Sequence, residues 1–161
     1  MKSLKDRHLL CLFSDDMRPE ISGKTTVVGW YTNNIVNMPP EGSLLLPKLC
    51  ITALLQTPVD RPFGEITIEV RLGKLVLQVA AVPSSAFESL GDASPAALLD
   101  EPAIGHQISI SIEAGNFIIQ EEGVLRVVAL ADGEEIMGNG LRFVRSAHPA
   151  LAPNKLSNTA A

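Results

Sequence analysis

The sequence predicts an all-β protein, a two-sheet antiparallel β-sandwich of immunoglobulin-like or similar topology with about eight strands. Several short runs alternate apolar and polar residues with a period of two, as half-buried strands do. Segments rich in glycine and proline separate these runs, which is typical of sandwiches. Strands do not alternate with helical patterns, and this argues against a parallel α/β fold.

The chain has 161 residues, of which 46% are apolar and 19% are charged. A chain of this length and composition can bury enough apolar surface to fold without disulfides or metals. We expect a single domain over residues 1–145. Residues 146–161 lack periodicity, so we expect them to form a flexible C-terminal tail.

Three strands are predicted in the first part of the chain, at residues 8–14, 24–31 and 48–57. The first and the third are so apolar that we expect both in central positions of a sheet. Trp30 and Tyr31 are adjacent, so on a strand their side chains point to opposite faces. We expect Trp30 in the core.

Two further alternating runs, at residues 66–72 and 75–81, predict a hairpin joined by a short Gly-Lys turn. Residues 108–113 alternate isoleucine with polar side chains and indicate another half-buried strand. The intervening crossover, residues 84–104, carries serine, glycine and proline at helix-capping positions. We predict a short helical turn there.

The last predicted hairpin combines residues 124–131 with residues 134–145. Asp132 and Gly133 join them, and this pair favours a tight turn because glycine tolerates a positive φ. Residues 138–140, Gly-Asn-Gly, interrupt the alternation of the second strand. We interpret this interruption as a bulge or a strand break.

Cys11 and Cys50 are the two cysteines, and each lies in an apolar run. Two cysteines are too few for a secreted disulfide scaffold or a zinc site. We expect buried free thiols, with a disulfide between the two as the alternative.

An acidic stretch follows the first predicted strand. Asp15, Asp16 and Glu20 could bind a metal, because loop carboxylates can supply oxygen ligands to calcium. Their spacing fits no EF-hand, and Arg18 could pair with one of them. We therefore interpret Asp16, Arg18, Glu20 and Gly23 as a structural turn in which a carboxylate accepts backbone N–H bonds. The metal site stays open as an alternative.

The loop after the second predicted strand is a candidate interaction surface, because it places one aromatic side chain beside polar residues. The candidate residues are Tyr31, Asn33, Asn34 and Met38.

Several function classes lack the residues that they need. The net charge is −5 and no segment concentrates lysine or arginine, which argues against nucleic acid. The sequence has neither a phosphate-binding loop nor a G-x-S-x-G elbow, so we expect no cofactor and no enzymatic activity. The N-terminal apolar run is too short for a signal peptide, and no run reaches the length of a membrane span. We expect a cytoplasmic protein that does not bind membranes.

Five motifs follow one another within about residues 9–145: an acidic-Arg-x-Glu turn, a Gly-Lys strand start, a V-G-x-Y strand, a P-K-L strand and a G-V-L-R-V hairpin. The positions that carry these five motifs are Asp16, Arg18, Glu20, Gly23, Lys24, Gly29, Tyr31, Pro47, Lys48, Leu49, Gly123 and Arg126. Pro62 and Phe63 belong to a further segment, R-P-F-G, between the P-K-L strand and the G-V-L-R-V hairpin. Together they resemble a family of small bacterial and prophage-associated proteins of unknown function. The resemblance implies structural roles for these residues and no activity.

We predict a non-catalytic protein-interaction module, associated with phage or prophage, that binds an unknown protein partner or itself. Two alternatives stay open. One is a small metal-dependent hydrolase or metal-binding domain that uses the acidic turn at residues 15–20. The other is a self-assembling structural protein whose edge strands pair between subunits.

Overall fold

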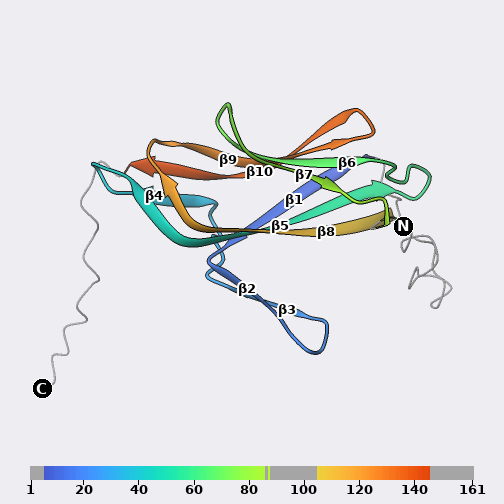
Figure 1. The fold of residues 1–161 in the computed structure, drawn as a ribbon, viewed down its shortest axis with the longest axis horizontal. Coiled ribbons are helices and arrows are strands. Elements are labelled where there is room, and N and C mark those ends of the chain that lie inside the picture. Colours follow the sequence, from blue (N-terminus) through green and yellow to red (C-terminus); the bar gives the residue numbers. More distant parts are fainter. Residues whose placement is uncertain (1–5, 86, 88–104, 146–161) are drawn as a thin grey trace, which may run out of the picture.

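The computed structural model describes residues 6–85, 87 and 105–145, and within them the fold is all-β, as predicted (Figure 1). The strands of this part of the chain are β1 (His8–Ser14), β2 (Asp16–Pro19), β3 (Thr25–Val28), β4 (Ile35–Met38), β5 (Leu44–Pro58), β6 (Ile66–Leu72), β7 (Leu75–Val82), β8 (Gly105–Ile119), β9 (Gly123–Ala131) and β10 (Glu134–Arg145). No helix in these residues is long and apolar enough to cross a membrane.

The strands form three sheets. One has the order β1-β5-β8, the second has the order β4-β10-β9-β6-β7, and β2 pairs with β3 alone. All neighbours are antiparallel except β4, which runs parallel to β10. The prediction of a wholly antiparallel arrangement is therefore wrong at β4. Because β4 and β10 are far apart in the chain, no tight hairpin forces them to run in opposite directions.

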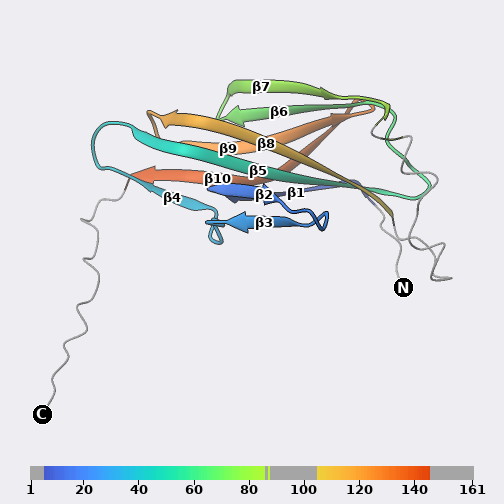
Figure 2. The same cartoon turned by 60° about the horizontal axis from the view of Figure 1, so that its bottom comes forward.

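The two larger sheets lie as layers around one hydrophobic core (Figures 1 and 2). Alternate side chains of β1, β5, β6, β9 and β10 point inward. The largest fully buried side chains include Phe13, Leu49, Leu55, Ile66, Ile68, Ile119, Leu125, Leu141 and Phe143. Each side chain of this size contributes about 1.5–3 kcal/mol through the apolar surface that it removes from water.

A bulge in β10 joins the two layers. The register against β9 shifts between Met137 and Gly140, which confirms the predicted interruption. Asn139 lies in the bulge, accepts a hydrogen bond from the Cys11 N–H (2.7 Å) and donates one to the Cys11 carbonyl (2.9 Å). A Cβ on Gly138 would lie 2.8 Å from Cys11 Sγ, so only glycine lets β1 approach this closely.

Both predicted hairpins, β6–β7 and β9–β10, are present. The second turns at Asp132 and Gly133, whose φ angles are 52° and 83°, as a tight primed turn requires. The central position predicted for the first strand is wrong, because β1 lies at a sheet edge and β5 is central. Residues 84–104, where a helical turn was expected, lie mostly outside the described residues, as does the predicted tail at 146–161.

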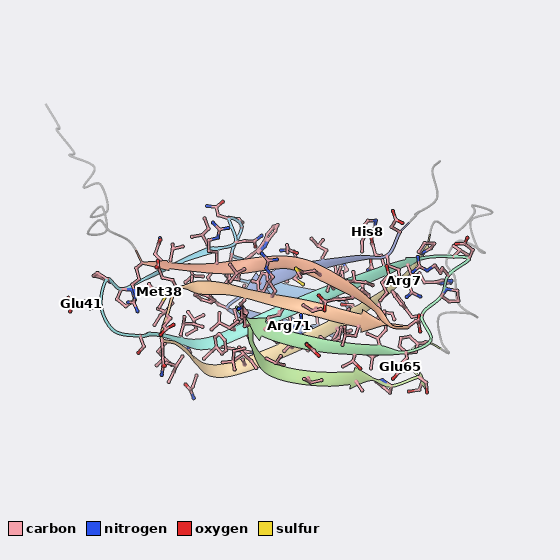
Figure 3. All side chains as sticks on the ribbon, turned by 90° about the horizontal axis from the view of Figure 1, so that it is seen from above. Arg7, His8, Met38, Glu41, Glu65 and Arg71 are labelled. Carbon is pink, nitrogen blue, oxygen red and sulfur yellow. The ribbon has the colours of Figure 1, made fainter. Side chains whose placement is uncertain are left out.

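Arg7 is the one charged residue buried in the described part of the chain, and it lies at the end of the layers opposite Met38 and Glu41 (Figure 3). Its guanidinium donates hydrogen bonds to Thr57 Oγ1 (3.3 Å), the Ala131 carbonyl (3.1 Å) and Asp132 Oδ2 (2.6 Å). It also lies over the Phe63 ring, 4.8 Å from the centroid. Arg7 thereby links the start of β1, the end of β5 and the β9–β10 turn.

We expect Arg7→Ala to lower the free energy of unfolding by about 2–3 kcal/mol, because it removes the ion pair with Asp132 and the donor to the buried Thr57 hydroxyl and the Ala131 carbonyl. Urea denaturation measures this. Arg18→Ala is the matched control, since that side chain is 69% exposed and ion pairs at the surface contribute little to stability. Equal urea midpoints for the two variants would show that the Arg7 contacts do not stabilise the fold.

Candidate functional site

The β2–β3 hairpin (residues 16–28) projects from the three-stranded sheet and is the most prominent feature of the outer surface (Figures 1 and 2). Asp16 pairs with Val28 at its base, and Pro19 pairs with Thr25 near its tip. All four residues of β3 are exposed. A two-stranded hairpin is marginally stable on its own, so contacts at its base must hold it in place.

Asp15 and Tyr31 close the base of the hairpin. The Asp15 N–H donates to the Val28 carbonyl (3.1 Å), and the Tyr31 hydroxyl donates to Asp15 Oδ1 (2.6 Å). Burial raises the pKa of Tyr31 above its ordinary value, and the Asp15 carboxylate raises it further. Gly29 has a φ of +67°, and a Cβ there would overlap the Asp15 carboxylate. Only glycine satisfies both conditions.

Asp16 ties the hairpin to β5. Lys48 Nζ lies 2.7 Å from Asp16 Oδ1, and Arg18 Nε lies 2.8 Å from Asp16 Oδ2. Lys48 also pairs with Glu113 on β8 at 3.1 Å. Hydrogen bonds from Lys48 and then Arg18 lower the pKa of Asp16 to about 2. The predicted local pairing of Arg18 is present, and Lys48 extends it to the sheet.

The underside of the hairpin covers the outer face of β5. Met17 is buried and its Sδ accepts a hydrogen bond from the Thr52 hydroxyl (2.7 Å). Cys50 Sγ lies 3.9 Å from the Asp15 carbonyl and is fully buried. Burial raises the pKa of the Cys50 thiol, and it raises that of Cys11 to about 12. Both cysteines are buried and free, as predicted, and the disulfide alternative is not observed.

The carboxylates of the acidic stretch engage different partners. Asp15 binds Tyr31, Asp16 binds Lys48 and Arg18, and Glu20 accepts a hydrogen bond from Thr26 near the tip. In residues 6–85, 87 and 105–145 no group of three or more His, Cys, Asp or Glu side chains could hold a metal ion. The predicted turn is wrong for Asp16 and Arg18, and in the described residues the carboxylates of this stretch accept hydrogen bonds from side chains and not from backbone N–H groups. Asp16 and Arg18 lie in β2, and the chain reverses where the Gly23 N–H donates to the Glu20 carbonyl (2.9 Å).

Exposed apolar side chains gather on the hairpin and at its base. They are Ile21, Val27, Val28 and Trp30. Trp30 is 57% exposed, so the prediction that it lies in the core is wrong. β3 ends at Val28 and the left-handed backbone of Gly29 turns the chain, so Tyr31 packs against the core instead.

The four predicted interaction residues lie in different environments. Tyr31 is half-buried and bound to Asp15, whereas Asn33 is exposed and Asn34 is partly exposed. Met38 is only 2% exposed and belongs to the core, so its assignment to an interaction surface is wrong. The pairing of β4 with β10 turns Met38 inward, and this pairing has no local signal.

At acidic pH, the pH dependence of the stability of this site is expected from Asp16. Its pKa is lowered to about 2 from 3.8, so its contribution is complete above about pH 4 and is lost as the pH falls through about 2. We expect Asp16→Asn to melt below the wild type at pH 7, and the two melting temperatures to converge between pH 4 and pH 2. Asp60→Asn, at an exposed aspartate without an ion pair in the described chain, is the control. A gap of constant size down to pH 2 would contradict this role of Asp16.

Comparison of the chain with protein-family models, with curated proteins and with solved structures finds no significant match. The resemblance to the prophage-associated family therefore stays a prediction from the motifs. The exposed apolar residues of the β2–β3 hairpin are the basis for a functional proposal.

Proposed function

We propose that the chain is a non-catalytic protein-interaction module with an immunoglobulin-like β-sandwich fold. The strand order supports the fold. If β1, β5 and β8 are lettered A, B and E, and β10, β9, β6 and β7 are lettered G, F, C and C′, the order is that of a variable-type immunoglobulin domain. In such domains one scaffold carries different loops and insertions, and the β2–β3 hairpin is an insertion of this kind.

The observation that carries the proposal is the apolar surface of the hairpin. Ile21 is fully exposed at the tip and Trp30 is more than half exposed at the base. Between them, Val27 and Val28 are exposed on opposite faces of β3. Isolated exposed apolar residues are ordinary, but several on one projecting element indicate an interaction site. Tryptophan is among the residues that contribute most to binding at protein interfaces.

The base of the hairpin is organised before any partner binds. Asp15, Asp16 and Met17 fix it to Tyr31, Lys48 and Thr52. A binding element that is already ordered loses less conformational entropy on association. Because the hairpin projects from the sheet, it fits a partner protein that has a concave, apolar site.

We expect Ile21→Ser/Trp30→Ser to abolish capture of the partner from a host lysate without lowering the melting temperature, because both side chains are exposed. The captured protein is then purified and titrated into the wild type. Trp30 is the only tryptophan, so its emission reports directly on the hairpin and is expected to shift to shorter wavelength as water is excluded. A partner retained by the double variant, or unchanged Trp30 emission, would refute the assignment to the hairpin.

β7 supports a second candidate, self-assembly through an edge strand. In the part of the chain that the structure describes, β7 has β6 as its one neighbour in the sheet. It has the sequence LVLQVAAV and exposes Leu75, Val76, Leu77 and Val79. Hollows of about 660, 250 and 200 Å³ lie between it and β8. Proteins commonly protect an edge strand with charges or proline, and β7 contains neither. A second copy related by a two-fold axis could pair with β7 in antiparallel fashion without charge repulsion.

Light scattering over a range of protein concentrations tests this second candidate. We expect a dimer that Val79→Lys converts to a monomer, because the charge would lie at the paired edge. Leu45→Lys is the control, since Leu45 is similarly exposed but lies on β5. A wild type that is monomeric throughout, or a dimer that survives Val79→Lys, would exclude assembly through β7.

A further inference from the structure

We propose that the outer face of the five-stranded sheet carries a binding site for a carboxylate group, formed by Arg126 on β9 and Arg142 on β10. A hollow of about 330 Å³ opens there, between these strands and the loop before β4. Asn33 and Asn34 line it beside the two arginines. The volume is at the lower end of the range for ligand pockets in proteins. The site is on the opposite layer from the hairpin base, so it stands independently of the proposed function.

The strand register brings the two arginines together. Arg126 lies opposite Gly140, and Arg142 lies two residues further along β10, opposite Val124. Leu125 and Leu141 point into the core, so Arg126 and Arg142 share the outer face. Diagonal neighbours of this kind are roughly 7–8 Å apart, which long side chains can span. Two guanidinium groups can therefore converge on one small ligand.

Gly140 keeps the hollow open. A Cβ at this position would overlap Val124 Cγ1 and would lie 3.0 Å from Arg126 Cγ. Any larger residue would displace the stem of Arg126 or fill the space beside it. The bulge that ends at Gly140 also sets which β10 residues face outward beyond it. The glycine thus provides both the space and the register of the site.

The charges of the two arginines are not neutralised within the described chain. Arg7, Arg18, Arg61 and Arg71 each form an ion pair with a carboxylate. No such pair involves Arg126 or Arg142 in residues 6–85, 87 and 105–145, and Arg126 Nη1 contacts only Met137 Sδ (2.9 Å). Arg145 also lacks an ion pair in these residues, but its guanidinium donates to the backbone carbonyls of Pro39, Gly42 and Gln120. Arg126 and Arg142 are the two such arginines that line the same hollow.

A carboxylate is the ligand that this arrangement fits. The planar guanidinium group donates two parallel N–H bonds to the two oxygens of a carboxylate. The side-chain amides of Asn33 and Asn34 add neutral donors at the rim. We therefore assign the site to a glutamate or aspartate side chain of an acidic polypeptide segment.

The test titrates an N-acetylated, C-amidated tetraglutamate peptide into ¹⁵N-labelled protein at constant ionic strength. We expect saturable shifts of the backbone amides of residues 33, 34, 126 and 142. Arg126→Gln and Arg142→Gln should each weaken binding at least fivefold. Both side chains are exposed, so both variants should fold. Arg18→Gln, at an exposed arginine on the hairpin, should bind like the wild type.

Two results would overturn the proposal. The first is the absence of specific binding. It would appear as amide shifts that do not saturate, that sodium chloride alone reproduces, or that persist in both arginine variants. The second is tighter binding of inorganic phosphate than of tetraglutamate at the same amides, which would reassign the hollow to phosphate groups. Binding of tetraglutamate that the arginine variants weaken supports the carboxylate site even if the hairpin has no partner.

Discussion

Coverage of β5 on both faces is the constraint on which the rest of the structure depends. Its inner side chains, Leu49 to Leu55 in alternation, meet the five-stranded sheet, while Cys50 lies under the hairpin on the outer side. β1 and β8 pair with its two edges. A slip of one residue would exchange these faces, so β5 can hold only one register. That register fixes the core and the base of the hairpin together.

The parts of the fold that were predictable from sequence are those whose signals are local. Period-two alternation defines β6, β7 and β9, and Asp132-Gly133 and the Gly-Asn-Gly interruption specify a turn and a bulge. β2 and β4 were missed because each has only four residues, too few to show a period. β4 forms by pairing with the edge of β10, which is far from it in the sequence. No local sequence pattern indicates this pairing.

The same distinction applies to the candidate sites. Arg18 and Asp16 are close in sequence and their pairing could be predicted, but Lys48 reaches Asp16 only through the folding of β2 over β5. The two arginines of the carboxylate site carry no motif, since their proximity comes from the register of β9 and β10 after the bulge. Trp30 was expected in the core on the assumption that the strand continues through residue 31. The left-handed backbone of Gly29 ends the strand, and the Trp30 side chain therefore points to solvent.

The two thiols lie at different depths of the molecule. Their reactivity can therefore distinguish two kinds of opening, detachment of the hairpin and separation of the layers. Cys50 is shielded by the start of the hairpin, whereas Cys11 packs between the two layers beside Gly138. Detachment of the hairpin would expose Cys50 to a thiol reagent while Cys11 stayed protected. Only separation of the layers would expose both. The order in which the thiols react therefore reveals whether the hairpin opens as a unit of its own.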